Sequence, residues 1–233
     1  MRIGLLVSIL LMFSAQLGFA EQKYSPEVSV KGDLSEVFEQ GNLPCVCFLG
    51  ACTKPAFEIS YGRIKLRSAR QVEVEKIREL ARDPEVLRNY SLEVEHLEMD
   101  TNDLIQRLFS GIRKTVFLGE GPGLALSFAV EDSITGEMVG IGNITRTIQS
   151  KDWEIGYAIS REFRGRGYAS EVVRTLLQFI FKTSPHGEVI ATPLETNILS
   201  QALLRKAGFQ QEFGWTFEPN PTGANQTAFV LRF

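Results

Sequence analysis

Arginine and glycine residues cluster in one short stretch of the chain, and both residue types suit the binding of an anion. The stretch Arg164-Gly165-Arg166-Gly167-Tyr168-Ala169-Ser170 follows a strand predicted over 153–160 and leads into an amphipathic helix. The first N–H groups of a helix have no partner within it and lie at the positive end of its dipole. Glycine lets the backbone approach a ligand closely, and Arg161, Arg164 and Arg166 add positive charge. The stretch therefore predicts a binding site for a phosphate or pyrophosphate group.

The same stretch has a purely structural alternative, because any strand-to-helix turn can carry glycines and solvated arginines. Two nucleotide-binding motifs fit it poorly. A P-loop requires Gly-Lys-Ser/Thr at the helix start, and a Rossmann fingerprint requires a third glycine or alanine where Ser170 stands. These departures disfavour nucleoside triphosphates and NAD as ligands.

Glu154 is the candidate general base on the predicted strand before this stretch. Successive side chains of a strand point to opposite faces, so Glu154 is expected on the face opposite the apolar residues. Those residues are Trp153, Ile155, Tyr157 and Ile159. A carboxylate beside the small Gly156 has room for an amine or a bridging water, and general-base help is worth about 10²–10⁴-fold in rate. The alternative is a structural ion pair with a neighbouring arginine such as Arg146.

The pattern Arg164-x-x-Gly167-x-Ala169 resembles the Arg/Gln-x-x-Gly-x-Gly/Ala loop of the GCN5-related N-acetyltransferases, the GNAT superfamily. The resemblance continues in order along the chain from about Gly62 to Phe233. Its other segments are Arg63-Ile64-Lys65-Leu66-Arg67, Gly136-Glu137-Met138-Val139-Gly140, Asp152-Trp153-Glu154-Ile155-Gly156-Tyr157, Asn197-x-x-Ser200 and Lys206-Ala207-Gly208-Phe209. It is most similar to the branch that acetylates ribosomal-protein N-termini and antibiotic or spermidine amines.

This resemblance implies an acetyl-CoA-dependent N-acetyltransferase that uses no metal and acts by direct attack of a primary amine. The implied acceptor is a small molecule or a protein N-terminus. The pyrophosphate of CoA is expected on the backbone of Gly165, Arg166, Gly167, Tyr168 and Ala169, flanked by Arg164. The pantetheine arm is expected along the strand backbone at Tyr157, Ala158 and Ile159, with Asn197 nearby. Glu154 and Ser200 are the expected catalytic residues.

One position departs from the superfamily pattern. A tyrosine on the last helix often protonates the leaving CoA thiolate in this superfamily, and Leu204 stands at the corresponding place here. A thiol is acidic enough to leave with little help, and Ser200 or water can replace the tyrosine. The departure also leaves open a second reading, in which the chain is a catalytically weak acyl-CoA-binding module or an exported interaction protein.

The elements that must position these residues follow from hydrophobic periodicity and turn signals. Strands are predicted over 63–67, 124–131, 138–149, 152–160, 188–192, 209–217 and 227–233, the last two as a closing hairpin. Helices are predicted over 72–82, 101–112, 167–182 and 196–208. This order indicates an α/β (α+β) fold, GNAT-like, with a central mixed, mostly antiparallel sheet and helices on both faces.

The N-terminal residues predict export or membrane anchoring, whereas the rest of the chain predicts an enzyme that needs a cosubstrate found inside cells. Residues 1–20 have a positive start, an apolar run and small residues before Glu21, which indicates a secretory signal peptide cut after Ala20 or an uncleaved anchor. Residues 21–61 form an N-terminal extension, and 62–233 the catalytic domain. The protein is then exported or membrane-anchored, whereas acetyl-CoA is kept inside cells. A start codon assigned too early makes it cytoplasmic instead.

The net charge and the cysteines bear on which partners and metals the chain can bind. With 25 basic and 28 acidic residues the net charge is −3, which disfavours nucleic acid as a partner. Contact with a membrane is expected only through residues 1–20, if they are not removed. Cys45, Cys47 and Cys52 lie together in the extension without a fourth metal ligand close in sequence, so a disulfide, a redox thiol or simple packing remain as their roles.

Overall fold

The computed structural model of the chain describes residues 29–31, 58–89, 112–118, 121–147, 152–184, 186–215 and 225–233. The predicted signal segment, the three cysteines and most of the predicted helix over 101–112 lie outside these residues. No helix within the described ranges is long and apolar enough to span a bilayer.

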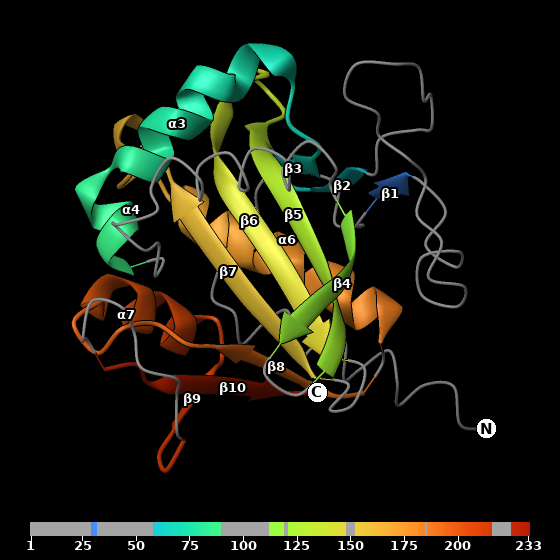
Figure 1. The fold of residues 1–233 in the computed structure, drawn as a ribbon, viewed down its shortest axis with the longest axis vertical. Coiled ribbons are helices and arrows are strands. Elements are labelled where there is room, and N and C mark those ends of the chain that lie inside the picture. Colours follow the sequence, from blue (N-terminus) through green and yellow to red (C-terminus); the bar gives the residue numbers. More distant parts are fainter. Residues whose placement is uncertain are drawn as a thin grey trace.

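One ten-stranded sheet forms the centre of the molecule, as Figure 1 shows. Its strand order is β1-β2-β3-β5-β6-β7-β8-β10-β9, and β4 also pairs with β5. The strands are β1 Ser29–Lys31, β2 Glu58–Tyr61, β3 Ile64–Arg67, β4 Ile112–Leu118, β5 Gly121–Asp132, β6 Met138–Thr147, β7 Trp153–Ile159, β8 Glu188–Ala191, β9 Gln210–Glu212 and β10 Ala228–Arg232. Among the described pairs only β7–β8 is parallel, so the predicted mixed, mostly antiparallel sheet is confirmed.

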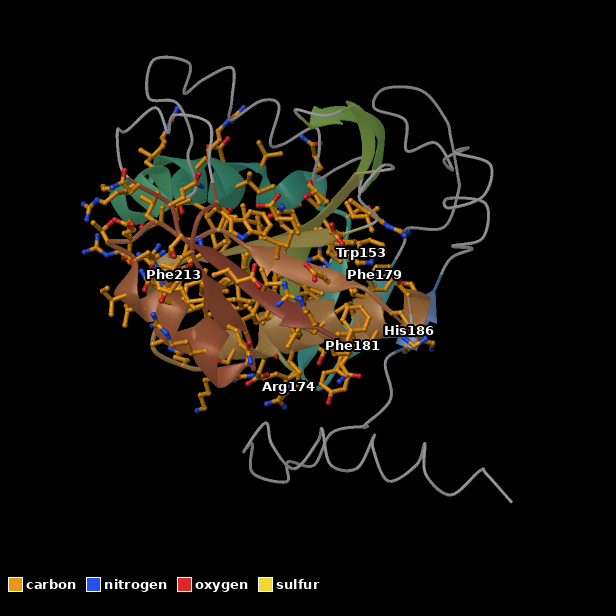
Figure 2. The ribbon with its side chains drawn as sticks, turned by 90° about the horizontal axis from the view of Figure 1, so that it is seen from below. Trp153, Arg174, Phe179, Phe181, His186 and Phe213 are labelled. Carbon is orange, nitrogen blue, oxygen red and sulfur yellow. The ribbon has the colours of Figure 1, made fainter. Side chains whose placement is uncertain are left out.

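Helices cover both faces of this sheet. Helix α6, Tyr168–Thr183, crosses behind β5, β6 and β7 in Figure 1 and packs on the larger core cluster. Trp153 of β7 and Phe179 of α6 are fully buried members of that cluster and are labelled in Figure 2. The opposite face carries α3, Val74–Arg82, and α4, Pro84–Asn89, over a second core cluster. Helix α7, Ile198–Lys206, contributes Leu204 to the larger cluster.

Helix α6 forms where the apolar residues recur at helical spacing. The buried stripe includes Val172, Val173, Leu176, Leu177 and Ile180, as the sequence predicts. The helix starts after Gly167, whose φ of 83° places it in the left-handed region that glycine adopts at least cost. Since β7 ends at Ile159, the chain needs only one 3-10 turn, η3 (Arg161–Phe163), and the glycine turn to pass from sheet to helix.

Three predicted elements are wrong in their bounds. The predicted helix over 101–112 cannot include Ile112, because this residue begins β4 and pairs with Leu126 of β5. Strand β5 starts at Gly121, before the predicted start at 124, because cross-strand pairing with β4 and β6 overrides the turn preference of its glycines. Strand β9 spans only 210–212 of the predicted 209–217, since the exposed Phe213 and Gly214, with a φ of 86°, follow it.

The sheet continues on the N-terminal side of Gly62. Strand β2, in the predicted extension, pairs antiparallel with β3 through Ile59 and Leu66, and β1 pairs with β2. Ile59, Ile64 and Leu66 are fully buried in the larger core cluster. The residues 58–61 therefore share the core of the 62–233 region.

Candidate active site

The parallel pair β7–β8 separates and opens a cleft in the sheet. In the described ladder the two strands pair only at Trp153 with Val189 and at Glu154 with Ile190, although β7 continues to Ile159. A cavity of about 630 Å³ lies at this opening. It is lined by residues from α4, β6, β7, the glycine turn, α6 and α7. The free edge of β7 thus faces a space large enough for an extended ligand.

The glycine turn closes one end of this cavity. Gly165 and Gly167 have φ of 73° and 83°, and they line the cavity together with the first helical residues Tyr168, Ala169 and Ser170. Nothing lies within 4 Å of the position a Cβ would take at Gly165, so the backbone there is open to a ligand. The helix-start N–H groups and the dipole of the 16-residue α6 make this end favourable for an anion.

Arg63, which immediately precedes β3, links the glycine turn to that strand, a contact that the sequence does not indicate. Its Nη2 donates to the carbonyl of Arg166 at 2.8 Å, and its Nε donates to Glu171 at 2.8 Å. Its guanidinium lies 4.1 Å from the centre of the Tyr168 ring, and the Tyr168 hydroxyl donates to Asp132 at 2.6 Å. Burial, together with the Asp132 carboxylate, raises the pKa of Tyr168, which keeps this hydroxyl protonated.

Arg164 joins the glycine turn to α4. Its Nε donates to the carbonyl of Ile159 at 3.0 Å, its Nη1 to Glu85 at 2.7 Å, and its Nη2 lies 3.3 Å from Asp83. Arg164, Glu85 and Val86 all line the cavity, so this arginine also forms part of its wall. Arg166 differs, because its guanidinium lies 5.7 Å from the Phe163 ring and it is not among the described lining residues.

Glu154 reaches the cavity from β7, on the face opposite the buried Trp153, as predicted. Thr192 Oγ1 donates to Glu154 Oε1 at 2.9 Å, and Thr145 Oγ1 donates to Oε2 at 3.5 Å. The guanidinium of Arg146, the alternative partner, lies 4.8 Å from the centre of the Trp153 ring. Two hydroxyl groups on either side therefore fix the orientation of the carboxylate.

A pair of hydroxyl groups crosses the cavity from β7 to α7. Tyr157 Oη and Ser200 Oγ are 2.9 Å apart, and both residues line the cavity. Burial raises the pKa of Tyr157, and the hydrogen bond with Ser200 offsets this only in part, so the phenol is protonated at neutral pH. Asn197 caps α7, because its side chain accepts from the Ser200 N–H at 3.1 Å. The sequence indicated Ser200 and the Tyr157 backbone, but not the contact between the two side chains.

Leu204 lies in the core rather than in the cavity. It is fully buried in the larger core cluster, and the neighbouring Leu203 lines the cavity instead. Trp215 is 41% exposed, is not among the described lining residues, and donates from its indole Nε1 to Glu212 at 3.1 Å. Within the described residues no group of three or more His, Cys, Asp or Glu side chains is placed to hold a metal ion.

The structure thus brings most of the predicted site residues into one cavity. They come from β7, the glycine turn, α6 and α7, and comprise Glu154, Tyr157, Ala158, Ile159, Arg164, Gly165, Gly167, Tyr168, Ala169, Asn197 and Ser200. The sequence missed Asn143, Thr145 and Thr192, which line the same cavity from β6 and the end of β8. No local motif marks them, because the pairing of β7 with β6 on one side and with β8 on the other brings them to Glu154.

Comparisons with known proteins agree with this architecture. The family model "Acetyltransferase (GNAT) domain" matches residues 63–210. A curated relative from Bacillus subtilis (strain 168), described as the uncharacterized N-acetyltransferase YnaD, is 33% identical over 60 residues. That match covers 26% of this chain and spans only 35% of the relative's length.

Solved structures share the fold at low sequence identity. A GNAT-family acetyltransferase from Bacillus anthracis has a TM-score of 0.57 at 20% identity, covering 75% of this chain and 98% of that one. Spermidine N-acetyltransferase from Vibrio cholerae, in complex with CoA and spermine, has a TM-score of 0.54 at 15% identity, covering 73% and 95%. The microcin C7 self-immunity acetyltransferase MccE, with acetyl-CoA and AMP, has 0.56 at 15%, covering 73% and 93%. On its sequence match and its fold, the chain belongs to the GNAT acetyltransferases.

Proposed function

We propose that this protein is an acetyl-CoA-dependent N-acetyltransferase that acetylates a primary amine by direct attack. The observation that carries the proposal is the opening between β7 and β8, which joins the glycine turn to Glu154 within one cavity. A ligand with an anionic end and an extended arm fits such a space. The spermidine N-acetyltransferase and MccE structures, solved with CoA or acetyl-CoA, support this choice of ligand.

The residues present fit the cosubstrate. The backbone of the glycine turn and the start of α6 would hold the pyrophosphate, because its N–H groups are open and no Cβ blocks Gly165. The free edge of β7 at Tyr157, Ala158 and Ile159 would hold the arm by strand-like hydrogen bonds. When bound, acetyl-CoA supplies a thioester carbon that accepts the amine nitrogen and a thiolate that leaves.

Protein side chains would remove the proton from the amine and donate a proton to the leaving thiolate. An amine attacks only as the neutral base, so Glu154 would take a proton from it, directly or through water. Ser200, hydrogen-bonded to Tyr157, would give a proton to the leaving sulfur from the α7 side. In the superfamily a tyrosine often stands at the position that Leu204 holds here. The Tyr157–Ser200 hydroxyl pair would take over its role, since both residues line the cavity.

A thiol-release assay with acetyl-CoA and a panel of amines tests the proposal. We expect turnover with at least one primary amine, and Glu154→Gln should lower kcat by about 10²–10⁴-fold because the general base is lost. The affinity for CoA should not change, since Glu154 lies away from the glycine turn.

The panel also separates the enzyme from a silent binding module. CoA binding without turnover on any amine would favour the acyl-CoA-binding module and overturn the proposal. Full activity in Glu154→Gln would show that Glu154 is not the general base. The proposal that the protein is an acetyltransferase would still hold.

A further inference from the structure

We infer that a second cavity beside the glycine turn holds the 3′-phosphoadenosine end of the cosubstrate, and that Arg88 and Arg161 bind its 3′-phosphate. The inference rests on the proposed acetyltransferase function. That function places the pyrophosphate on the glycine turn and the arm along β7, and it leaves the nucleoside of CoA without a site. The two arginines are then the residues that make the protein selective for CoA over dephospho-CoA, which lacks the 3′-phosphate.

The second cavity adjoins the first and has a volume of about 450 Å³. Pockets for small ligands and cofactors have volumes of about 300–1,000 Å³. The two cavities share lining residues from α4, the glycine turn and the start of α7, namely Glu85, Asn89, Arg164, Asn197 and Leu199. A single ligand can therefore extend from one cavity into the other.

The second cavity lies at the pyrophosphate end of the site and away from the amine. Among the described residues, Thr145, Glu154 and Thr192 line the first cavity but not the second. Arg161 and Arg164 line the second cavity, and both follow the end of β7. An arm that runs along β7 from Glu154 leads to the glycine turn, and the nucleoside of CoA is attached to the far side of the pyrophosphate. The nucleoside therefore extends beyond the turn, where the second cavity lies.

Two arginines of this cavity are available to a ligand. Arg88 and Arg161 are exposed, and neither guanidinium has a hydrogen bond or ion pair with another described residue. Arg164 instead donates to Glu85 at 2.7 Å and lies 3.3 Å from Asp83, so the two carboxylates of the cavity face this arginine.

The charge of the cavity matches a phosphate monoester. Three arginines and two carboxylates line it, which leaves it with a net positive charge. A phosphate monoester carries a charge of about −1.5 to −2 at pH 7, and the fork of a guanidinium matches its oxygens. Arg88 and Arg161 therefore provide the hydrogen-bond donors and the charge that a 3′-phosphate requires.

The start of α7 adds an apolar wall to the same cavity. Ile198 and Leu199 are 64% and 79% exposed, and both line the cavity. An adenine ring that lies on these side chains would remove apolar surface from water, which favours binding. Apolar side chains for a base and guanidinium groups for a phosphate thus occur in one cavity.

Calorimetry with CoA and dephospho-CoA tests the role of the two arginines. We expect the wild type to bind CoA about 10- to 30-fold more tightly, because hydrogen bonds between charged groups are stronger than neutral ones. Arg88→Gln and Arg161→Gln should each weaken CoA binding about 3- to 5-fold and change the Kd for dephospho-CoA less than about twofold. The double variant should bind the two ligands equally.

Arg82→Gln is the matched control. Arg82 is also exposed and carries the same charge, but it is not among the described lining residues of either cavity. Arg82→Gln should leave the preference for CoA within about twofold of the wild type. An equal loss in Arg82→Gln would mean that the general field of the protein attracts the phosphate, and this result would overturn the assignment of Arg88 and Arg161.

Two further measurements test the site of the nucleoside. Adenosine 3′,5′-bisphosphate should compete with CoA, and adenosine 5′-phosphate should compete at least about tenfold more weakly because it lacks the 3′-phosphate. Ile198→Asn should weaken the binding of CoA and of dephospho-CoA alike, by about 3- to 10-fold, because both ligands carry the base. Wild-type affinity for both ligands in Ile198→Asn would show that the base does not lie on α7.

These outcomes separate the two proposals. A wild type that binds neither CoA nor dephospho-CoA refutes both. A wild type that binds CoA but acetylates no amine fails as an acetyltransferase, whereas its preference for CoA still tests the second cavity. Equal wild-type affinity for the two ligands, or a full preference in the double variant, rejects the role of Arg88 and Arg161 alone. If a variant does not fold, competition by the two adenosine phosphates on the wild type decides the question.

Discussion

Hydroxyl groups from neighbouring strands orient the carboxylate on which the proposed chemistry depends. Thr192 Oγ1 donates to Glu154 at 2.9 Å from the end of β8, and Thr145 Oγ1 donates from β6 at 3.5 Å. Because Glu154 is only half-buried, its side chain would otherwise sample several rotamers. The shorter of these contacts assigns to Thr192 the role of a positioning residue for the base.

Replacing Thr192 with valine tests this role, because valine keeps the shape and removes the hydroxyl. Thr192→Val should lower kcat about 3- to 10-fold, the worth of one hydrogen bond, with the KM for the amine little changed. Thr192→Ser should restore most of the rate because it keeps the donor. Steady-state kinetics of both variants provide the measurement, and a full rate in Thr192→Val with a loss in Thr192→Ser would show that the methyl group, not the hydroxyl, matters.

The glycine turn depends on a residue that precedes β3. Arg63 donates to the Arg166 carbonyl and to Glu171, and it stacks on Tyr168. The turn has two left-handed glycines and an exposed surface, so few of its own contacts fix its shape. Arg63 therefore holds the first turn of α6 and the loop before it in a single arrangement.

Arg63→Gln should weaken CoA binding because the turn loses two hydrogen bonds and a stacking partner. We expect the Kd for CoA, measured by calorimetry, to rise about 3- to 10-fold while kcat at saturating acetyl-CoA stays near the wild-type value. Arg63→Lys keeps the charge but loses the paired geometry, and it should lie between the two. A lower melting temperature with an unchanged Kd would contradict this role.

A buried group of charges joins the sheet to the helices on its α3 face. Arg67 is 5% exposed and donates to Glu131 at 2.7 Å and to both oxygens of Glu73. Lys65 also lies 3.2 Å from Glu131. This group links β3 to β5 and to the 3-10 turn η1, Gln71–Glu73, which leads into α3. Breaking a buried pair is costly because the remaining charge has no partner.

The stability of the protein should therefore depend on Glu131 and on pH. Burial alone would raise the pKa of Glu131, but Arg67 and Lys65 outweigh it and hold this pKa below its ordinary value of 4.5. The same balance lowers the pKa of Glu73. A lowered pKa in the folded state adds stability above the ordinary value, and this stability is lost as the pH falls through the folded value.

Glu131→Gln should lower the free energy of unfolding by about 3 kcal/mol at pH 7, as measured by urea denaturation. The difference from wild type should shrink as the pH falls below about 4.5, because the wild-type carboxyl becomes protonated as well. The exposed pair of Glu188 with Arg232 offers a control, and Glu188→Gln should cost at most about 1 kcal/mol. A difference that is constant with pH would exclude the charge as its cause.

Local pattern was enough to find most of the elements and one strand of the site. The alternation of apolar and other residues along 153–159 predicted the sheet face on which Glu154 lies. The apolar stripe predicted for α6 contains the residues that the helix buries. Ile112 was misassigned, because its place in β4 depends on pairing with Leu126, which no local pattern records. Leu204 lies in the core and does not line the cavity. This placement depends on how α7 packs, which the local sequence does not reveal.

The sequence by itself determined the glycine turn, the carboxylate on the strand before it and the family resemblance, because each depends on residues that are neighbours along the chain. Only the tertiary structure decided the surroundings of that carboxylate: Thr192 and Asn143 beside Glu154, the Tyr157–Ser200 contact, and Arg63 beneath the turn. These contacts join residues from different strands and helices. Strand register and helix packing set them, and neither is encoded at short range.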